Sequence, residues 1–193
     1  HEITEADAEG ILCIKHSWPS MARTIYGDHQ RYADTYFSSF VGMYFTGDGA
    51  KRDAKGNYRI TGRVDDIVIV SGHNLGTAEI ENAINEHPNV AESAVVGYPH
   101  AIKGNSIYAF VTLKGSNLEE SVTSGIKELV AKTLGPICKP EKIQITTGLP
   151  KTRSGKIMRR ILRKVAAGEF ENLGDISTLL NPECVQEVIK GRL

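Results

Sequence analysis

The chain has 193 residues, of which 40% are hydrophobic and 24% charged, as is typical of a globular protein. Its 23 basic and 23 acidic residues give a formal net charge of zero, which argues against a nucleic-acid partner except through a local basic patch. No apolar run approaches the roughly 20 residues of a membrane span, so we expect no membrane partner. At roughly 150 residues per domain, the length predicts one domain or two small ones.

The three cysteines, Cys13, Cys138 and Cys184, are far apart and lack the spacing of a zinc site. We therefore expect free thiols in a reducing compartment and a cytoplasmic protein. The sequence starts at His1, without a methionine and inside a polar segment. We therefore expect the chain to be part of a longer polypeptide.

The first third of the chain predicts short, irregularly spaced elements. An apolar stretch at 11–15 is typical of a strand, and the pair Trp18-Pro19 ends it. Residues 47–49, Gly-Asp-Gly, predict a turn, and the alternation at 58–61 predicts the second arm of a hairpin. Aromatic side chains recur at the spacing of one face of a short helix, at Tyr32, Tyr36, Phe37 and Phe40.

Strands and helices follow more regularly from about residue 66. The continuous β-branched run at 67–70 predicts a strand buried on both faces. After it we expect, in chain order, a loop at 71–76, a helix through Ile84, strands at 90–97 and 107–113, a helix ending at 135–136, a strand at 142–145, a basic loop at 150–156, a helix ending at Gly168 and a final short helix.

This order predicts an α+β fold, in which a small mixed sheet packs against helices and a β-hairpin-rich segment precedes it. We place the domain boundary in the charged corner at 62–66. Residues 1–64 are then the end of one domain. Residues 65–193 are long enough to form a second domain with its own core.

Three segments hold more functional groups than folding requires. Asp48 lies between two glycines, where a carboxylate can accept hydrogen bonds from vicinal hydroxyls, although this segment alone favours a plain Asp-Gly turn. Arg63 precedes the buried strand, and Ser71, Gly72 and their neighbours follow it. Lys156 follows a glycine in a basic loop, where an ammonium can stabilise a developing oxyanion or phosphate.

In this order and spacing, the segments resemble the C-terminal part of the acyl-CoA synthetases of the adenylate-forming superfamily, and most closely the acetyl-CoA synthetases. The resemblance covers nearly the whole chain, at residues 18–19, 23–29, 44–50, 62–66, 71–73, 75–81, 150–160, 173–175 and 177–179. It implies that the second domain is the mobile C-terminal lid of such an enzyme. It also implies that residues 1–64 are the end of the large N-terminal adenylation domain.

The resemblance implies an AMP-forming ligase reaction in two steps. Acetate and Mg-ATP give acetyl-AMP and diphosphate, and CoA then displaces AMP while the lid rotates between the steps. ATP, Mg²⁺ and CoA are thus the expected ligands. A propionyl- or other short-chain acyl-CoA synthetase and a non-catalytic module that binds CoA or an adenylate remain as alternatives. We expect the chain alone to be inactive.

The resemblance also assigns roles to residues. It implies that Asp48 and Arg63 bind the ribose of ATP or AMP, with Asn74 near the AMP phosphate. Asp65 is the implied hinge, Ser71 and Gly72 line the implied CoA passage, and Lys156 is the implied catalytic residue. A magnesium ion is implied at Asn85, His87 and Val90.

Two departures and one regulatory expectation complete this comparison. Asn74 stands where the family commonly has an arginine, and an amide carries no charge. Ala131 stands where related enzymes have an arginine that meets the CoA phosphates, although Lys132 is adjacent. Lys156 matches a lysine that is acetylated in this family, so an acetyltransferase and a deacetylase are expected partners.

Overall fold

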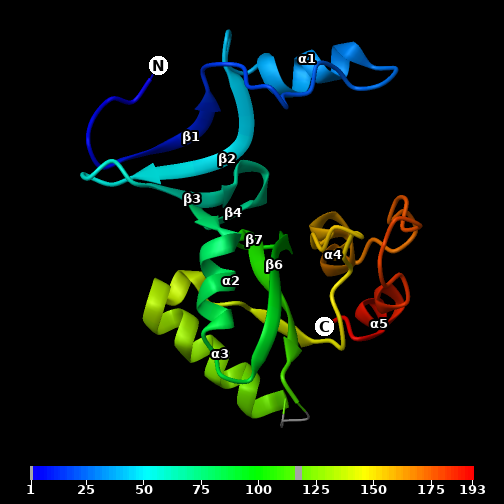
Figure 1. Cartoon of the computed structure of the whole chain (residues 1–193). Coiled ribbons are helices and arrows are strands. Elements are labelled where there is room, and N and C mark those ends of the chain that lie inside the picture. Colours follow the sequence, from blue (N-terminus) through cyan, green and yellow to red (C-terminus); the bar gives the residue numbers. More distant parts are fainter. Residues whose placement is uncertain (1, 116–118) are drawn as a thin grey trace. The chain divides into compact units, whose positions relative to one another are not determined.

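A computed structural model describes residues 2–115 and 119–193, and the chain separates into two compact units, His1–Asp65 and Asp66–Leu193 (Figure 1). The assignment of these units to the end of an adenylation domain and to a lid remains a prediction. Within the described ranges no helix is both long and apolar enough to cross a bilayer. The cysteines are free, as expected, with Cys13 half-buried and the other two buried.

The first unit is a three-stranded antiparallel sheet with one helix. The strands β1 (Ala8–Ile14), β2 (Tyr44–Arg52) and β3 (Tyr58–Arg63) lie side by side in that order. Helix α1 (His29–Phe37) starts where the Asp28 carboxylate accepts a hydrogen bond from the Arg31 N–H. The predicted aromatic face packs on β2, where Tyr36 stacks on Tyr44 with ring centroids 4.8 Å apart.

The predicted turn at 47–49 is wrong, because these residues lie inside the continuous strand β2. Gly47 adopts a left-handed φ of 78°, and the register shifts between Gly49 and Ala50. A bulge therefore absorbs the glycines without ending the strand. Asp48 consequently pairs with Arg63 across β2 and β3.

The second unit contains a five-stranded sheet in which β5, β4, β7 and β6 are adjacent in that order and β8 pairs with β7. All pairs are antiparallel except β7 with β8, so the predicted mixed sheet is confirmed. The strands are β4 (Ile67–Val70), β5 (His73–Gly76), β6 (Val90–His100), β7 (Gly104–Leu113) and β8 (Lys142–Ile145).

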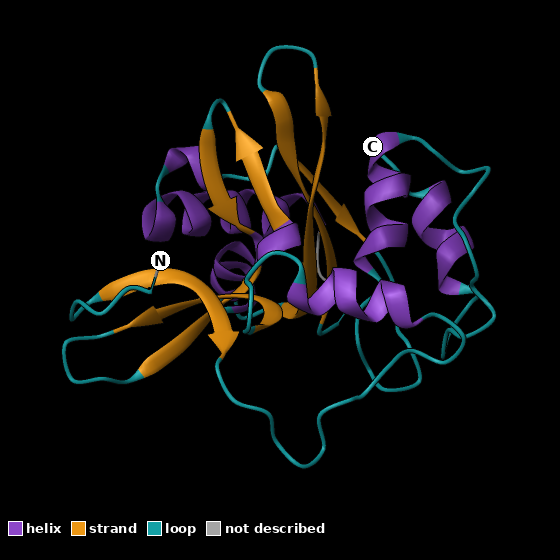
Figure 2. Ribbon diagram, turned by 90° about the horizontal axis from the view of Figure 1, so that it is seen from above, coloured by secondary structure: helices purple, strands orange, loops and turns teal. Residues whose placement is uncertain are grey.

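Helices cover both faces of this sheet (Figure 2). Helices α2 (Thr77–Asn85) and α3 (Glu119–Leu134) cover one face, where Val95, Ile107 and Ala109 point. Helices α4 (Arg159–Ala167) and α5 (Cys184–Lys190) cover the other, where Tyr108 and Phe110 point. Alternate residues of β6 and β7 thus serve two cores, which makes these central strands apolar on both sides.

Two expectations about the edge of the sheet are corrected. The strand β4 is not buried on both faces, since its residues alternate and Ile69 is 52% exposed. The predicted loop at 71–76 is mostly strand, because His73–Gly76 forms β5 and pairs back on β4. Only Ser71 and Gly72 connect the two strands. Both have positive φ values, 49° and 83°, as a two-residue hairpin turn of type I′ requires.

Candidate functional site

Asp48 and Arg63 form a polar pair on the first unit. The Arg63 Nη1 lies 3.8 Å from the Asp48 Oδ1, and the Asp48 N–H donates to the Thr46 hydroxyl. The Asp48 side chain is 33% exposed and the Arg63 side chain is 52% exposed. An accessible carboxylate beside a guanidinium offers acceptors and donors together, which suits a pair of sugar hydroxyls.

The boundary between the units runs between two acidic residues with different partners. The Asp65 carboxylate accepts from Arg63 Nε at 2.9 Å, so this pair belongs to the first unit. The Asp66 carboxylate accepts from Arg163 Nη2 of α4 at 2.7 Å and belongs to the second. The peptide bond between Asp65 and Asp66 therefore joins the two units, and each of these side chains is bound by an arginine of its own unit.

The hairpin turn, defined as Ser71 and Gly72 between β4 and β5, is exposed. The Ser71 N–H donates to the Lys103 carbonyl at 3.1 Å, and no atom lies within 4 Å of a Cβ built on Gly72. Asn74 follows on the exposed side of β5, opposite Ile69. The turn thus presents open space beside a hydroxyl and an amide.

Lys156 lies on a short hairpin within residues 150–158, here called the lysine loop. Lys151 pairs with Ile157, and the Thr152 N–H donates to the Lys156 carbonyl at 2.9 Å. The Thr152 hydroxyl accepts from the Lys156 N–H at 3.2 Å. These bonds fix the backbone of Lys156, whose side chain is exposed. The ammonium is consequently presented from an ordered backbone.

Residues 79–156 match the family described as the AMP-binding enzyme C-terminal domain. These residues therefore correspond to an AMP-binding enzyme C-terminal domain. The match begins in α2 and ends at Lys156, so it covers most of the sheet and most of the lysine loop.

Relatives of known name match well beyond the AMP-binding enzyme C-terminal domain. The acetyl-coenzyme A synthetase of Syntrophobacter fumaroxidans is 58% identical over 193 residues, which are 99% of this chain and 30% of that protein. The acetyl-coenzyme A synthetase of Pseudoalteromonas translucida is 59% identical over 98% of this chain and 29% of that protein. The chain thus spans about 30% of the length of these curated relatives.

Among solved structures, ATP-bound MatB from Rhodopseudomonas palustris superposes with a TM-score of 0.69 at 28% identity, over 83% of this chain and 31% of that one. Acetoacetyl-CoA synthetase from Streptomyces lividans superposes with a TM-score of 0.79 at 24% identity, over 96% of this chain and 28% of that one. The second likeness supports the fold alone.

The second unit also holds an ion pair that the motifs did not reveal. The Arg159 guanidinium, next to the lysine loop, contacts both oxygens of Glu81 in α2, at 2.6 and 2.8 Å. Burial raises the pKa of the Glu81 carboxyl, whereas the Val95 N–H and Arg159 lower it less strongly. The pair is 78 residues apart in sequence, so no local spacing signals it.

The residues predicted to bind magnesium lie where α2 ends. The Asn85 Oδ1 accepts from the Ser93 hydroxyl at 2.9 Å, and the His87 carbonyl accepts from the Val90 N–H at 3.0 Å. Amide and carbonyl oxygens are ligands that magnesium takes, so an ion bound here would use the Asn85 amide oxygen and backbone oxygens and would keep most of its water. The described residues contain no cluster of three or more His, Cys, Asp or Glu suited to a metal.

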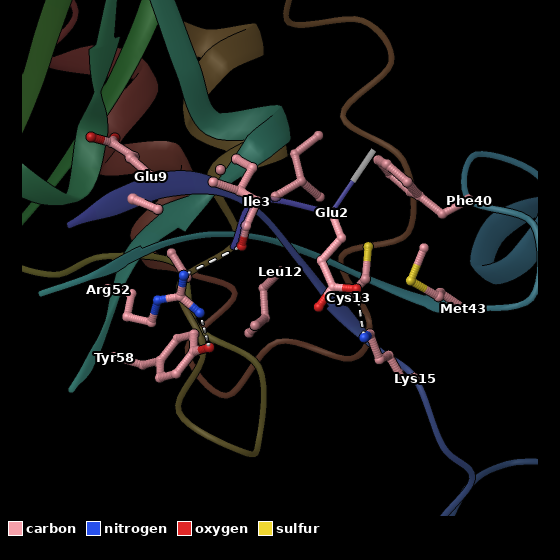
Figure 3. A pocket seen from close by; sticks show the side chains of 14 residues that line it. Glu2, Ile3, Glu9, Leu12, Cys13, Lys15, Phe40, Met43, Arg52 and Tyr58 are labelled. Carbon is pink, nitrogen blue, oxygen red and sulfur yellow. Dashed lines mark hydrogen bonds and ion pairs between the residues drawn. The ribbon is translucent and has the colours of Figure 1, made fainter. Parts of the chain in front are cut away.

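Residues of the first unit line a cavity of about 470 Å³ (Figure 3). The Arg52 guanidinium donates to the Ile3 carbonyl and the Tyr58 hydroxyl, and Glu2 forms an ion pair with Lys15. None of the predicted site residues lines it.

The structure therefore groups the predicted residues by unit. Asp48, Arg63 and Asp65 lie together in the first unit. The hairpin turn, Asn74 and the lysine loop belong to the second unit, on separate segments. At the end of α3, Ala131 is half-buried and Lys132 exposed, so of the two only Lys132 presents a charge.

Proposed function

We propose that the chain is part of an AMP-forming acetate–CoA ligase. An acetate oxygen attacks the α-phosphorus of Mg-ATP, the bond to diphosphate breaks, and acetyl-AMP forms. The CoA sulfur then attacks the acetyl carbon, AMP leaves, and the thiol proton passes to solvent. The exposed ammonium of Lys156 on its fixed backbone carries this proposal. The names of relatives 58–59% identical to this chain support acetate as the acid.

In the first step Lys156 stabilises the negative charge that meets at the junction of carboxylate and α-phosphate. A positioned cation of this kind acts before and during bond formation and needs no proton transfer. Asp48 accepts hydrogen bonds from the ribose hydroxyls, and Arg63 donates beside it, as their adjacent and accessible positions allow. The ATP-bound state of the MatB relative supports a nucleotide as ligand.

In the second step the C-terminal domain rotates and withdraws Lys156. Asp65 is the proposed hinge, because the residues on either side of its carbonyl are held by different units. The hairpin turn then borders the CoA thiol arm, where Gly72 leaves space, and Asn74 donates to the AMP phosphate. CoA is the proposed acyl acceptor.

The proposal also includes a magnesium site and a site of lysine acetylation. Asn85, His87 and Val90 would hold a hydrated magnesium ion through oxygen atoms, and the ion would supply positive charge at the end of α2. Lys156 is the proposed site of acetylation by an acetyltransferase, with removal by a deacetylase. Acetylation neutralises the ammonium and therefore stops the first step while sparing the second.

The test uses the full-length protein and measures the half-reactions separately. We expect Lys156→Ala to lower acetate-dependent ATP–diphosphate exchange by at least about 100-fold, the effect of losing one positioned charge. Thioester formation from supplied acetyl-AMP and CoA should stay within about twofold. Lys139→Ala removes another exposed lysine and serves as the control. Equal loss of both half-reactions in a folded variant would contradict the proposal.

Replacing acetate by propionate in the exchange assay separates the related acyl-CoA synthetases. A higher kcat/KM with propionate would make propionate the substrate and leave the role of Lys156 intact. Binding of CoA without exchange or thioester formation would instead indicate a non-catalytic module. We expect no synthetase activity from the 193-residue chain alone, since it spans about 30% of the relatives' length.

A further inference from the structure

Glu141 lies at the centre of a polar cluster between the sheet and the turn that joins β6 to β7. Its carboxylate accepts from Lys103 Nζ at 2.9 Å and from the Ser106 hydroxyl at 2.6 Å, and lies 3.4 Å from His100 Nε2. These donors, first Lys103 and then Ser106, hold the pKa of the Glu141 carboxyl at about 2. The carboxylate is therefore charged whenever the protein works near neutral pH.

The backbone of Glu141 is fixed as firmly as its side chain. The Glu141 N–H donates to the Ile107 carbonyl of β7 at 3.0 Å, and its carbonyl accepts from Lys127 Nζ of α3 at 3.0 Å. Ser106, which its carboxylate contacts, is only 3% exposed. Glu141 thus joins the buried sheet to the exposed turn.

His100 closes the β6–β7 turn, defined as residues 101–103. Its Nδ1 accepts from the Ile102 N–H at 3.1 Å and from the Lys103 N–H at 3.2 Å. Because Nδ1 is an acceptor, the ring proton of the neutral imidazole is on Nε2, which faces Glu141. One carboxylate consequently holds this turn through the Lys103 side chain and the His100 ring.

The β6–β7 turn in turn holds the hairpin turn. The Lys103 carbonyl accepts the Ser71 N–H at 3.1 Å. Ser71 has a φ of 49°, a conformation that costs a non-glycine residue free energy and persists only when neighbours fix it. The ladder between β4 and β7 pairs only Val70 with Gly104 here, so few other bonds fix the hairpin turn to the sheet.

We propose that Glu141 is a positioning residue for the thioester-forming step. It holds Lys103 and His100, these hold the β6–β7 turn, and the Lys103 carbonyl sets where Ser71 and Gly72 lie. The proposal rests on the proposed function, in which the hairpin turn borders the CoA thiol arm. It assigns Glu141 no role in adenylation, since no contact described here links it to the lysine loop. Glu141 touches no substrate and acts only through the turn.

The experiment uses the full-length protein and the variants Glu141→Ala and Glu141→Gln. We expect Glu141→Ala to raise the KM for CoA, with acetyl-AMP supplied, by about threefold to tenfold, since small misplacements at a site are costly. Glu141→Gln retains an acceptor for Ser106 and should show a smaller rise. ATP–diphosphate exchange should stay within about twofold in both. Glu128→Gln, an exposed acid on α3, is the matched control.

Amide hydrogen exchange at Ser71 gives a direct second readout. We expect its exchange in Glu141→Ala to accelerate on the order of tenfold, because local opening becomes easier. If Glu141→Ala does not fold, Lys103→Gln removes the ion pair from the exposed side and should give the same selective rise in KM. Equal losses in both half-reactions would overturn the proposal, as would an unchanged KM with unchanged Ser71 exchange.

The same measurements separate this proposal from the function on which it rests. Absence of thioester formation in the unmodified protein would refute the proposed function and, with it, any role for Glu141 in that step. The Ser71 amide would still report whether Glu141 holds the hairpin turn. If the unmodified protein carries out both half-reactions and the Glu141 substitutions do not selectively raise the KM for CoA, only the positioning role is refuted.

Discussion

Gly47 meets two requirements at once, one of the backbone and one of space. Its φ of 78° lies in the left-handed region, and a Cβ built there would come within 2.8 Å of Arg63 Nη1. The guanidinium of Arg63 therefore occupies the space that any other side chain at position 47 would need. This arrangement brings Arg63 beside Asp48 and fixes the geometry of the proposed ribose contact.

We expect Gly47→Ala to weaken nucleotide binding by moving Arg63. The strained φ should cost about 1 kcal/mol of folding free energy, and the displaced guanidinium should raise the KM for ATP by about fivefold or more. Gly56→Ala is the matched control, because Gly56 has a φ of 84° and no atom within 4 Å of its built Cβ. An equal KM for ATP in both variants would show that Arg63 does not bind the nucleotide.

At the scale of elements, sequence patterns predicted the helices and strands whose formation depends on residues close together in the chain. The spacing of Ile80, Ala83 and Ile84 predicted α2, and the order of strands and helices predicted the mixed sheet. The β2 strand was missed because glycine flanks of Asp48 are typical of turns, and only pairing on both sides makes them strand.

The candidate site likewise contains residues that local motifs reveal and contacts that only tertiary packing creates. The residues that a motif contains, such as Lys156, were predicted from the sequence, and their roles remain predictions. The ion pairs of Glu81 with Arg159 and of Glu141 with Lys103 were not predicted, because the partners are 78 and 38 residues apart. Such pairs depend on tertiary packing and leave no periodic or spaced signal in a single sequence.

The lysine loop depends on the segment before α5 for its position. The Asn181 amide donates to the Leu149 carbonyl at 3.0 Å, and its Oδ1 accepts from the Lys151 N–H at 3.2 Å. The Leu180 N–H also donates to the Lys151 carbonyl at 2.8 Å. One asparagine thus satisfies two backbone groups at the base of the loop that presents Lys156.

We expect Asn181→Ala to lower ATP–diphosphate exchange by about tenfold while thioester formation stays within about twofold, since a loosened loop misplaces Lys156. Unpaired backbone groups should also cost about 1–3 kcal/mol of folding free energy, measured by denaturant unfolding. Asn172→Ala, an exposed position in the same part of the chain, is the control. A parallel fall in both half-reactions would mean that Asn181 serves stability alone.

At the scale of the whole molecule, two ion pairs lie on either side of the boundary between the units, which falls between Asp65 and Asp66. Arg63 holds Asp65 within the first unit, and Arg163 holds Asp66 within the second. The Asp65 side chain is 62% exposed, whereas the Asp66 side chain is only 12% exposed. In the proposed function, a rotation of one unit relative to the other is concentrated at the Asp65 backbone, because a hinge residue absorbs large dihedral changes.

We expect Asp65→Pro to lower overall acetyl-CoA formation by at least about tenfold, because proline fixes φ and restricts the preceding residue as well. The Asp65→Pro variant should keep whichever half-reaction its fixed domain orientation allows. ATP–diphosphate exchange and thioester formation should therefore be affected to different extents. Asp65→Ala removes the ion pair with Arg63 and leaves the backbone free, and its overall rate should fall by less than about threefold. Similar rates for Asp65→Pro and Asp65→Ala would place the hinge elsewhere, since only proline restricts the rotation.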